Sequence, residues 1–202
     1  MVNFPRFHPR LWHLLLLMAL ILPALLPLFR PGYFYTHDDI QLVRLKEMQD
    51  CFTYGQIPCR WVSDFGAGFG HPLFNYHPVL AYYLGMIPRL LGFSFLASAK
   101  ILFGASLLLS GIFFFYLASL FFSLPLSLLG SLLFVYAPYH AVQIYVRGAL
   151  TEAWGIAFFP LIFYAIFHFF SKPLPKFFLL SVLSLYGLFL AQNILRLVLI
   201  YF

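Results

Sequence analysis

Long apolar runs restrict the fold of this chain more than any other feature of its sequence. An α-helix needs about 20 residues to cross a bilayer, and the runs that approach this length are Leu11–Phe29, Phe95–Phe122, Leu124–Tyr139, Ala153–Phe170 and Phe177–Leu195. Hydrophobic residues make up 63% of the chain and charged residues only 9%, a composition that excludes a soluble domain. The sequence therefore predicts an all-α transmembrane protein with about five spans.

These spans indicate a single polytopic membrane domain over residues 1–202. The first span, 11–29, leads into a long loop over 30–94, and four further spans follow over 95–195. The last residues, Leu199–Phe202, are still apolar and no charged residue ends a span there. We therefore expect the sequence to be truncated at its C-terminus.

Basic residues flank the spans and orient them. Those before the first span and after the fourth favour the cytoplasmic side: Arg6, Arg10, Lys172 and Lys176. As a helix, the segment 78–92 would be about 22 Å long, too short to cross, so we expect it along the membrane surface or re-entrant. The N-terminus is then cytoplasmic, and the segments 29–78 and 139–152 share the extracytoplasmic face.

The net charge of +6 comes from basic residues scattered along the chain, which argues against nucleic acid as a partner. Gly66, Gly68 and Gly70 resemble a phosphate-cradling loop only superficially, because no strand precedes them and no helix follows. Turns rich in glycine are the better interpretation.

The acidic residues concentrate in the first long loop. Five of the six lie there, namely Asp38, Asp39, Glu47, Asp50 and Asp64. The sixth, Glu152, lies beside the fourth span.

A helical periodicity begins next to the first two acids. Thr36 can cap this helix, with Asp39 reaching back in the manner of a capping box. An apolar stripe follows at helical spacing, made of Leu42, Leu45, Met48 and Phe52, and the polar side holds Lys46, Glu47, Asp50 and Asp39. Asp38 falls on the apolar side. The pattern predicts an amphipathic helix on the membrane surface with Asp38 turned inward.

The segment 55–78 is predicted to be an ordered loop. Cys51 and Cys59 flank its start and either form a disulfide or remain free thiols. Arg60 and Asp64 are expected to form a salt bridge. The neighbouring aromatic residues fit an interfacial belt: Trp61, Tyr76, Tyr82 and Tyr83.

The residues from Leu11 to Phe170 resemble those of a known family. The resemblance rests on His37-Asp38, Arg44, Pro58-Cys59-Arg60-Trp61, Asp64, Gly68-Phe69-Gly70, Pro72-Leu73-Phe74-Asn75-Tyr76, Pro78, Ala137-Pro138-Tyr139, Val146-Arg147-Gly148-Ala149-Leu150 and Glu152. They are similar to bacterial and archaeal polytopic proteins known as 6-pyruvoyl-tetrahydropterin synthase-related membrane proteins. Pterin chemistry does not follow from that name, because the soluble synthase needs a histidine-bound zinc site that this sequence lacks.

The layout also resembles the N-terminal module of C-type membrane glycosyltransferases, the GT-C superfamily. The resemblance implies a prokaryotic plasma-membrane enzyme of the cell envelope that moves a hexosyl or pentosyl group from a polyprenyl-phosphate-linked donor to a glycan, lipid or protein acceptor. It also implies an active site on the extracytoplasmic face. Asp38, with Asp39 beside it, matches the catalytic acid of the first outer loop, and Glu152 matches the second-loop acid.

Each site residue also has a structural interpretation. Asp38 can act as a general base on the acceptor, or both aspartates can only stabilise a helix start. Arg147 can hold the carrier phosphate, or it pairs with Glu152. The remaining candidates for substrate binding are His37, Arg60, Asp64, Asn75 and Tyr76.

A divalent metal, Mg²⁺ or Mn²⁺, is the cofactor that the resemblance allows, with Asp38 and Glu152 as oxygen ligands. Many relatives carry a pair of acids in the second loop, whereas this chain has one. The alternative function is a non-catalytic membrane protein, such as a lipid-linked glycan transporter or a cell-envelope assembly partner. Charges near mid-depth would favour a transporter, and Lys100 is the partial example.

Overall fold

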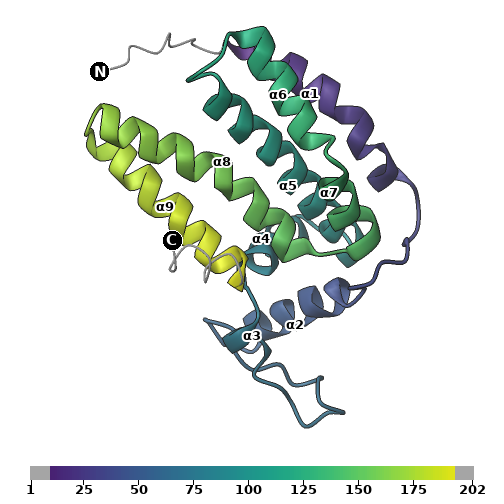
Figure 1. The fold of residues 1–202 in the computed structure, drawn as a ribbon. Coiled ribbons are helices and arrows are strands. Elements are labelled where there is room, and N and C mark those ends of the chain that lie inside the picture. Colours follow the sequence, from purple (N-terminus) through teal and green to yellow (C-terminus); the bar gives the residue numbers. More distant parts are fainter. Residues whose placement is uncertain (1–9, 194–202) are drawn as a thin grey trace.

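Helices account for the regular structure of residues 10–193, the part of the chain that the computed structural model describes (Figure 1). This agrees with the predicted all-α class. The elements are α1 (Leu11–Leu25), the 3₁₀ helix η1 (Leu26–Phe29), α2 (Gln41–Thr53), α3 (Leu73–Tyr76), α4 (Leu80–Leu90), α5 (Phe95–Ala118), α6 (Leu124–Val135), α7 (Pro138–Ala141), the π-helical η2 (Val142–Arg147), α8 (Leu150–Ser171) and α9 (Pro175–Ala191).

Three helical segments are long and apolar enough to cross a membrane, as the sequence predicts for an integral membrane protein. They are Leu11–Phe29, Phe95–Ala118 and Leu150–Ser171. A fourth results if α6 and the following Pro138–Arg147, which are bent by 42°, count as one span. At 17 residues, α9 is shorter than these, and Leu195, the expected end of the fifth span, lies outside the described residues.

The helix boundaries differ from the prediction most clearly around residue 140. The segment 139–152, expected to be a loop, is helical as far as Arg147. Pro138 starts a new helical turn, where its missing N–H costs nothing, and Gly148 ends the helix at φ +66°. In addition, α8 begins at Leu150 instead of Ala153, and α5 ends at Ala118 instead of Phe122.

The long helices pack around α5, which contacts α1, α6 and α8, while α9 lies along α8 (Figure 1). Small residues allow close approach between these helices. A Cβ added at Gly111 of α5 would lie 2.6 Å from Ile21 Cδ1 and 2.8 Å from Val135 Cγ2. The Ser131 hydroxyl of α6 donates a hydrogen bond to the Gly111 carbonyl at 2.5 Å.

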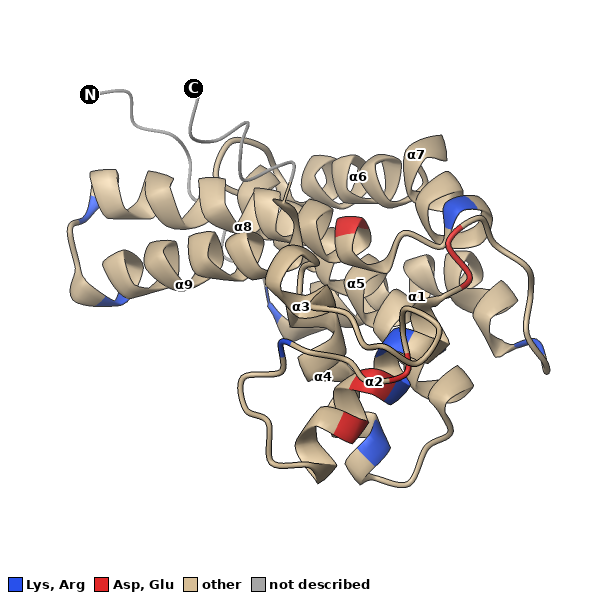
Figure 2. Cartoon of the chain, turned by 90° about the horizontal axis from the view of Figure 1, so that it is seen from below, with Lys and Arg blue, Asp and Glu red and all other residues tan. Residues whose placement is uncertain are grey.

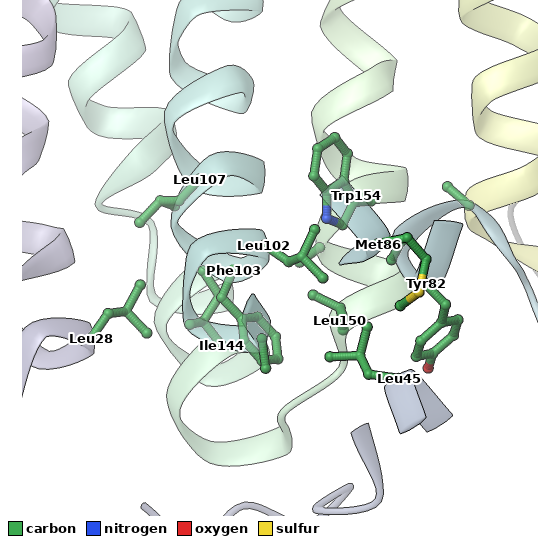
Figure 3. Close-up of a cluster of buried hydrophobic side chains, with 14 of the residues drawn as sticks. Leu28, Leu45, Tyr82, Met86, Leu102, Phe103, Leu107, Ile144, Leu150 and Trp154 are labelled. Carbon is green, nitrogen blue, oxygen red and sulfur yellow. The ribbon is translucent and has the colours of Figure 1, made fainter. Parts of the chain in front are cut away.

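One end of the bundle is closed by α2 and α4. Figure 3 shows the apolar cluster between these helices and the bundle, where Leu45 of α2 and Tyr82 of α4 meet Leu102 of α5 and Leu150 of α8. All four are nearly inaccessible to solvent. With 11 residues, α4 is about 16 Å long, and one of its faces is buried against α2 and α5 while Ile87 and Leu90 are exposed. Tyr82, expected in an interfacial belt, is instead fully buried.

Candidate functional site

Two connections that lie far apart in the sequence meet at the closed end of the bundle. The backbone N–H groups of His37 and Asp38 donate to the carbonyl oxygens of Val146 and Arg147, at 3.0 and 2.8 Å. The Gln41 amide donates to the Gly148 carbonyl at 2.9 Å. The first acidic loop and the segment before Glu152 thus hold each other through their backbones.

Gly148 permits this close approach. Its φ of +66° lies in the left-handed region that favours glycine. A Cβ at this position would lie 2.4 Å from the Thr36 hydroxyl and 2.8 Å from the Thr36 Cβ. Thr36 is buried in this contact.

The predicted capping of α2 by Thr36 is wrong. The helix begins at Gln41 after a turn, and its N-cap, Ile40, makes no side-chain capping bond. The reason is tertiary, because the N–H groups of His37 and Asp38 bond to the segment 146–147 instead of starting a helix.

The Asp38 carboxylate is held from α2. Its Oδ2 accepts bonds from Gln41 Nε2 at 2.7 Å and from Arg44 Nη1 at 2.9 Å, and Arg44 Nη1 also contacts Oδ1 at 3.1 Å. The Asp38 side chain is 38% exposed, whereas that of Arg44 is only 14% exposed. The Asp38 carboxylate therefore has a fixed orientation and remains partly accessible to solvent.

A chain of hydrogen bonds continues from Gln41 into the protein. The Tyr82 hydroxyl donates to Gln41 Oε1 at 2.7 Å and lies 2.9 Å from His77 Nε2. Because the Tyr82 proton goes to Gln41, His77 Nε2 donates to Tyr82. Burial and the positive charge of Arg44 lower the pKa of His77 to about 4. His77 is therefore neutral at physiological pH.

Glu152 forms an ion pair with Arg147, as the structural interpretation of these two residues expected. Arg147 Nη1 lies 2.6 Å from Glu152 Oε2, and Nη2 lies 3.0 Å from Oε1, which is a forked contact. Gln143 bonds to both side chains and to the Tyr139 hydroxyl. The Arg147 side chain remains 42% exposed.

Five other candidate residues lie on the surface of the protein. His37, Asp39, Arg60, Asn75 and Tyr76 are all exposed. Asn75 and Tyr76 belong to the single turn of α3, so the structure does not bring them into the Asp38 network.

The expected salt bridge between Arg60 and Asp64 is not formed. Asp64 pairs instead with Lys46 at 2.6 Å, and Lys46 also contacts Asp50 at 2.7 Å. The hydrogen bond and positive charge of Lys46 lower the pKa of Asp64. Glu47, placed on the polar face of α2 by its periodicity, has a side chain that is only 1% exposed. Burial, together with the negative charge of Asp64, raises the pKa of Glu47.

The disulfide alternative is realised, because Cys51 and Cys59 are bonded to each other. Cys51 lies in α2 and Cys59 in the loop that follows. The bond therefore fixes the start of the loop 55–72 on the helix that carries Arg44.

Figure 2 shows the acidic positions on and around α2 and near the start of α8. The opposite end of the bundle, where α8 ends and α9 begins, carries only basic positions.

Asp38 and Glu152, the expected metal ligands, each have a cationic partner and an amide partner. Among residues 10–193, the acidic group with metal-ligand spacing is Glu47, Asp50 and Asp64.

Little in the sequence indicates the amide and phenol partners of the two acids. Gln41 and Gln143 are almost fully buried, and each bonds to one of the two candidate acids. The available signal was polarity in an apolar context, because Gln143 lies in the run Ala-Val-Gln-Ile.

Comparison of the chain with protein-family models, with curated proteins and with solved structures finds no match.

Proposed function

We propose that this chain is a C-type membrane glycosyltransferase, or part of one, that uses a polyprenyl-phosphate-linked sugar on the extracytoplasmic face. In this proposal α9 completes five spans, α2 is an interfacial helix and α4 is a re-entrant segment. The observation that carries the proposal is the meeting of the Asp38 turn with the segment before Glu152, through backbone hydrogen bonds at one end of the bundle.

Asp38 would serve as the base for the acceptor. In an inverting transfer a carboxylate takes the proton of the acceptor hydroxyl or amide as the anomeric carbon is attacked, which contributes about 10²- to 10⁴-fold. Gln41 and Arg44 orient the carboxylate from α2, and the exposed part of the Asp38 side chain would face the acceptor. Arg44 is mostly buried and would act by positioning Asp38.

Arg147 would receive the carrier phosphate. Three of its N–H···O contacts go to Gln143 and Glu152, and its exposed guanidinium can add a phosphate oxygen as a further acceptor. Glu152 would then be a positioning residue for Arg147. No step is assigned to a metal at Asp38 and Glu152, because each carboxylate already forms an ion pair with an arginine.

The experiment is transfer of radiolabelled sugar from a lipid extract in membranes that contain the protein. Asp38→Asn should reduce transfer by about 10²-fold or more. The matched variant Asp39→Asn, which makes the same charge change one residue away, shows which of the two acids acts. Equal transfer by wild type and Asp38→Asn would remove the base assignment.

One observation favours the alternative of a non-catalytic membrane protein, such as a lipid-linked glycan transporter or assembly partner. Both acids are already paired with arginines, as expected if they only hold the two connections in shape. Absence of transfer by wild type and both variants, with the protein correctly folded, would support this function.

A further inference from the structure

A second group of acidic side chains lies further along α2. Glu47 and Asp50 are three residues apart on the helix, and Asp64 comes from the loop that follows Cys59, the disulfide partner of Cys51 on α2. One carboxylate oxygen from each lies within 4.8 Å of the other two. The Lys46 ammonium lies among them, 2.7 Å from Asp50, 2.6 Å from Asp64 and 4.0 Å from Glu47 Oε1. One positive charge therefore faces three negative ones.

Glu47 is the unusual member of this group. Its side chain is 1% exposed, and its Oε1, which faces the Lys46 ammonium at 4.0 Å, has no hydrogen-bond partner. A buried carboxylate oxygen without a partner is costly. Asp50 and Asp64 are 29% and 57% exposed, so the group has a buried inner ligand and an outer rim that water reaches.

We propose that Glu47, Asp50 and Asp64 bind a divalent cation of the Ca²⁺ type, and that the Lys46 ammonium takes its place when the cation is absent. Ca²⁺ accepts six to eight oxygen ligands in irregular arrangements and completes its shell with water, whereas Mg²⁺ demands a near-octahedral site. Three carboxylates from two separate segments, open to water on one side, suit the first ion better.

Lys46 differs from the arginines that pair with Asp38 and Glu152. Its side chain is 47% exposed and its bonds lie at the surface, so it can move into solvent when a cation arrives. Its hydrogen bonds to Asp50 and Asp64 satisfy two carboxylates but not Glu47. A divalent ion would contact all three and would lower the local charge from −3 to −1.

The position of the site suggests its role. A cavity of about 300 Å³ adjoins it, lined by Glu47, Asp50, Tyr54 and Trp61 among others. A bound ion would join α2 to the loop that carries Trp61, and so fix the wall of this cavity. The inference does not depend on the glycosyltransferase proposal.

The test uses Tb³⁺ as the probe, on the purified chain in detergent with its disulfide intact. Tb³⁺ emission excited through the aromatic side chains should saturate and be displaced by Ca²⁺. Trp61→Phe should lower the emission without changing the Ca²⁺ concentration needed for displacement.

Three variants decide the assignment. Asp64→Asn should weaken binding at least about tenfold, a loss of about 1.4 kcal/mol. Asp39→Asn makes the same charge change outside the group and should shift affinity less than about twofold. Lys46→Gln removes the competing ammonium, keeps all three carboxylates and should tighten binding severalfold.

Equal weakening by Asp39→Asn and Asp64→Asn would show general attraction to a negative surface and would overturn the proposal. Unchanged or weaker binding by Lys46→Gln would also overturn it, and would leave a salt-bridge network only. If Asp64→Asn does not fold, the Lys46→Gln result decides alone.

Discussion

Replacing Gly148 by alanine tests the contact on which the candidate site depends. The new methyl group would lie 2.4 Å from the Thr36 hydroxyl, 2.8 Å from the Thr36 Cβ and 3.1 Å from the Asp38 carbonyl. The Thr36 Cβ and the Asp38 carbonyl are fixed by the backbone, so they cannot move without shifting the turn that presents Asp38. The φ of +66° adds backbone strain for any residue other than glycine.

The expected loss has two parts. A left-handed backbone costs an alanine roughly 1–2 kcal/mol, and forcing a methyl group into a filled space costs roughly 1–3 kcal/mol. Gly148→Ala should therefore destabilise the fold by about 2–5 kcal/mol. Gly92→Ala is the matched control, because Gly92 has φ +86° but nothing within 4 Å of an added Cβ. Gly92→Ala should therefore lose only the stability that the left-handed backbone costs.

Thermal unfolding in detergent measures the difference between the two variants. A difference of about 2 kcal/mol corresponds to a midpoint that is roughly 4–8 °C lower for Gly148→Ala. Adding Thr36→Ala should recover part of that loss, because it removes the atom nearest to the new methyl group. Equal midpoints for Gly148→Ala and Gly92→Ala would refute the close approach of the two connections.

Two further predictions concern the surroundings of the site. The pKa of His77 is about 4 in the folded chain and about 6.5 in the unfolded chain, so the unfolded state binds more protons between pH 6.5 and pH 4. Stability should fall by roughly 3 kcal/mol as the pH decreases through this window. His77→Asn should reduce the decrease in melting temperature over this pH range. An unchanged dependence of the melting temperature on pH would contradict the assignment. Cys59→Ser opens the bond to Cys51 and should cost about 2.5 kcal/mol in chemical unfolding. The variant should unfold like the reduced wild type, and a stability equal to that of the oxidised wild type would contradict this prediction.

The helical class and the main spans could be predicted because they depend on local composition. A run of about 20 apolar residues has few alternatives to a membrane helix. The contact between the first acidic loop and the segment 146–148 could also be anticipated in outline. Helices that alternate in direction bring every second connection to the same end of a bundle.

The details of the site could not be predicted because they depend on contacts between distant segments. Thr36 satisfies a local capping pattern, yet the backbone beside it bonds to residues more than 100 positions away. Periodicity placed Glu47 on a solvated face, but the loop that holds Asp64 folds over it. Arg60 is close to Asp64 in the sequence, but the path of that loop brings Asp64 to Lys46 instead.

The bond from Gln41 to Gly148 spans 107 positions, and this separation has a consequence for biosynthesis. At about 5–20 residues per second, the ribosome needs roughly 5 to 20 s to make Gly148 after Gln41. During that interval the polar groups around Thr36 lack their final neighbours while the intervening helices are already inserting. Accessory factors that shield nascent membrane segments would find their natural target in this short stretch.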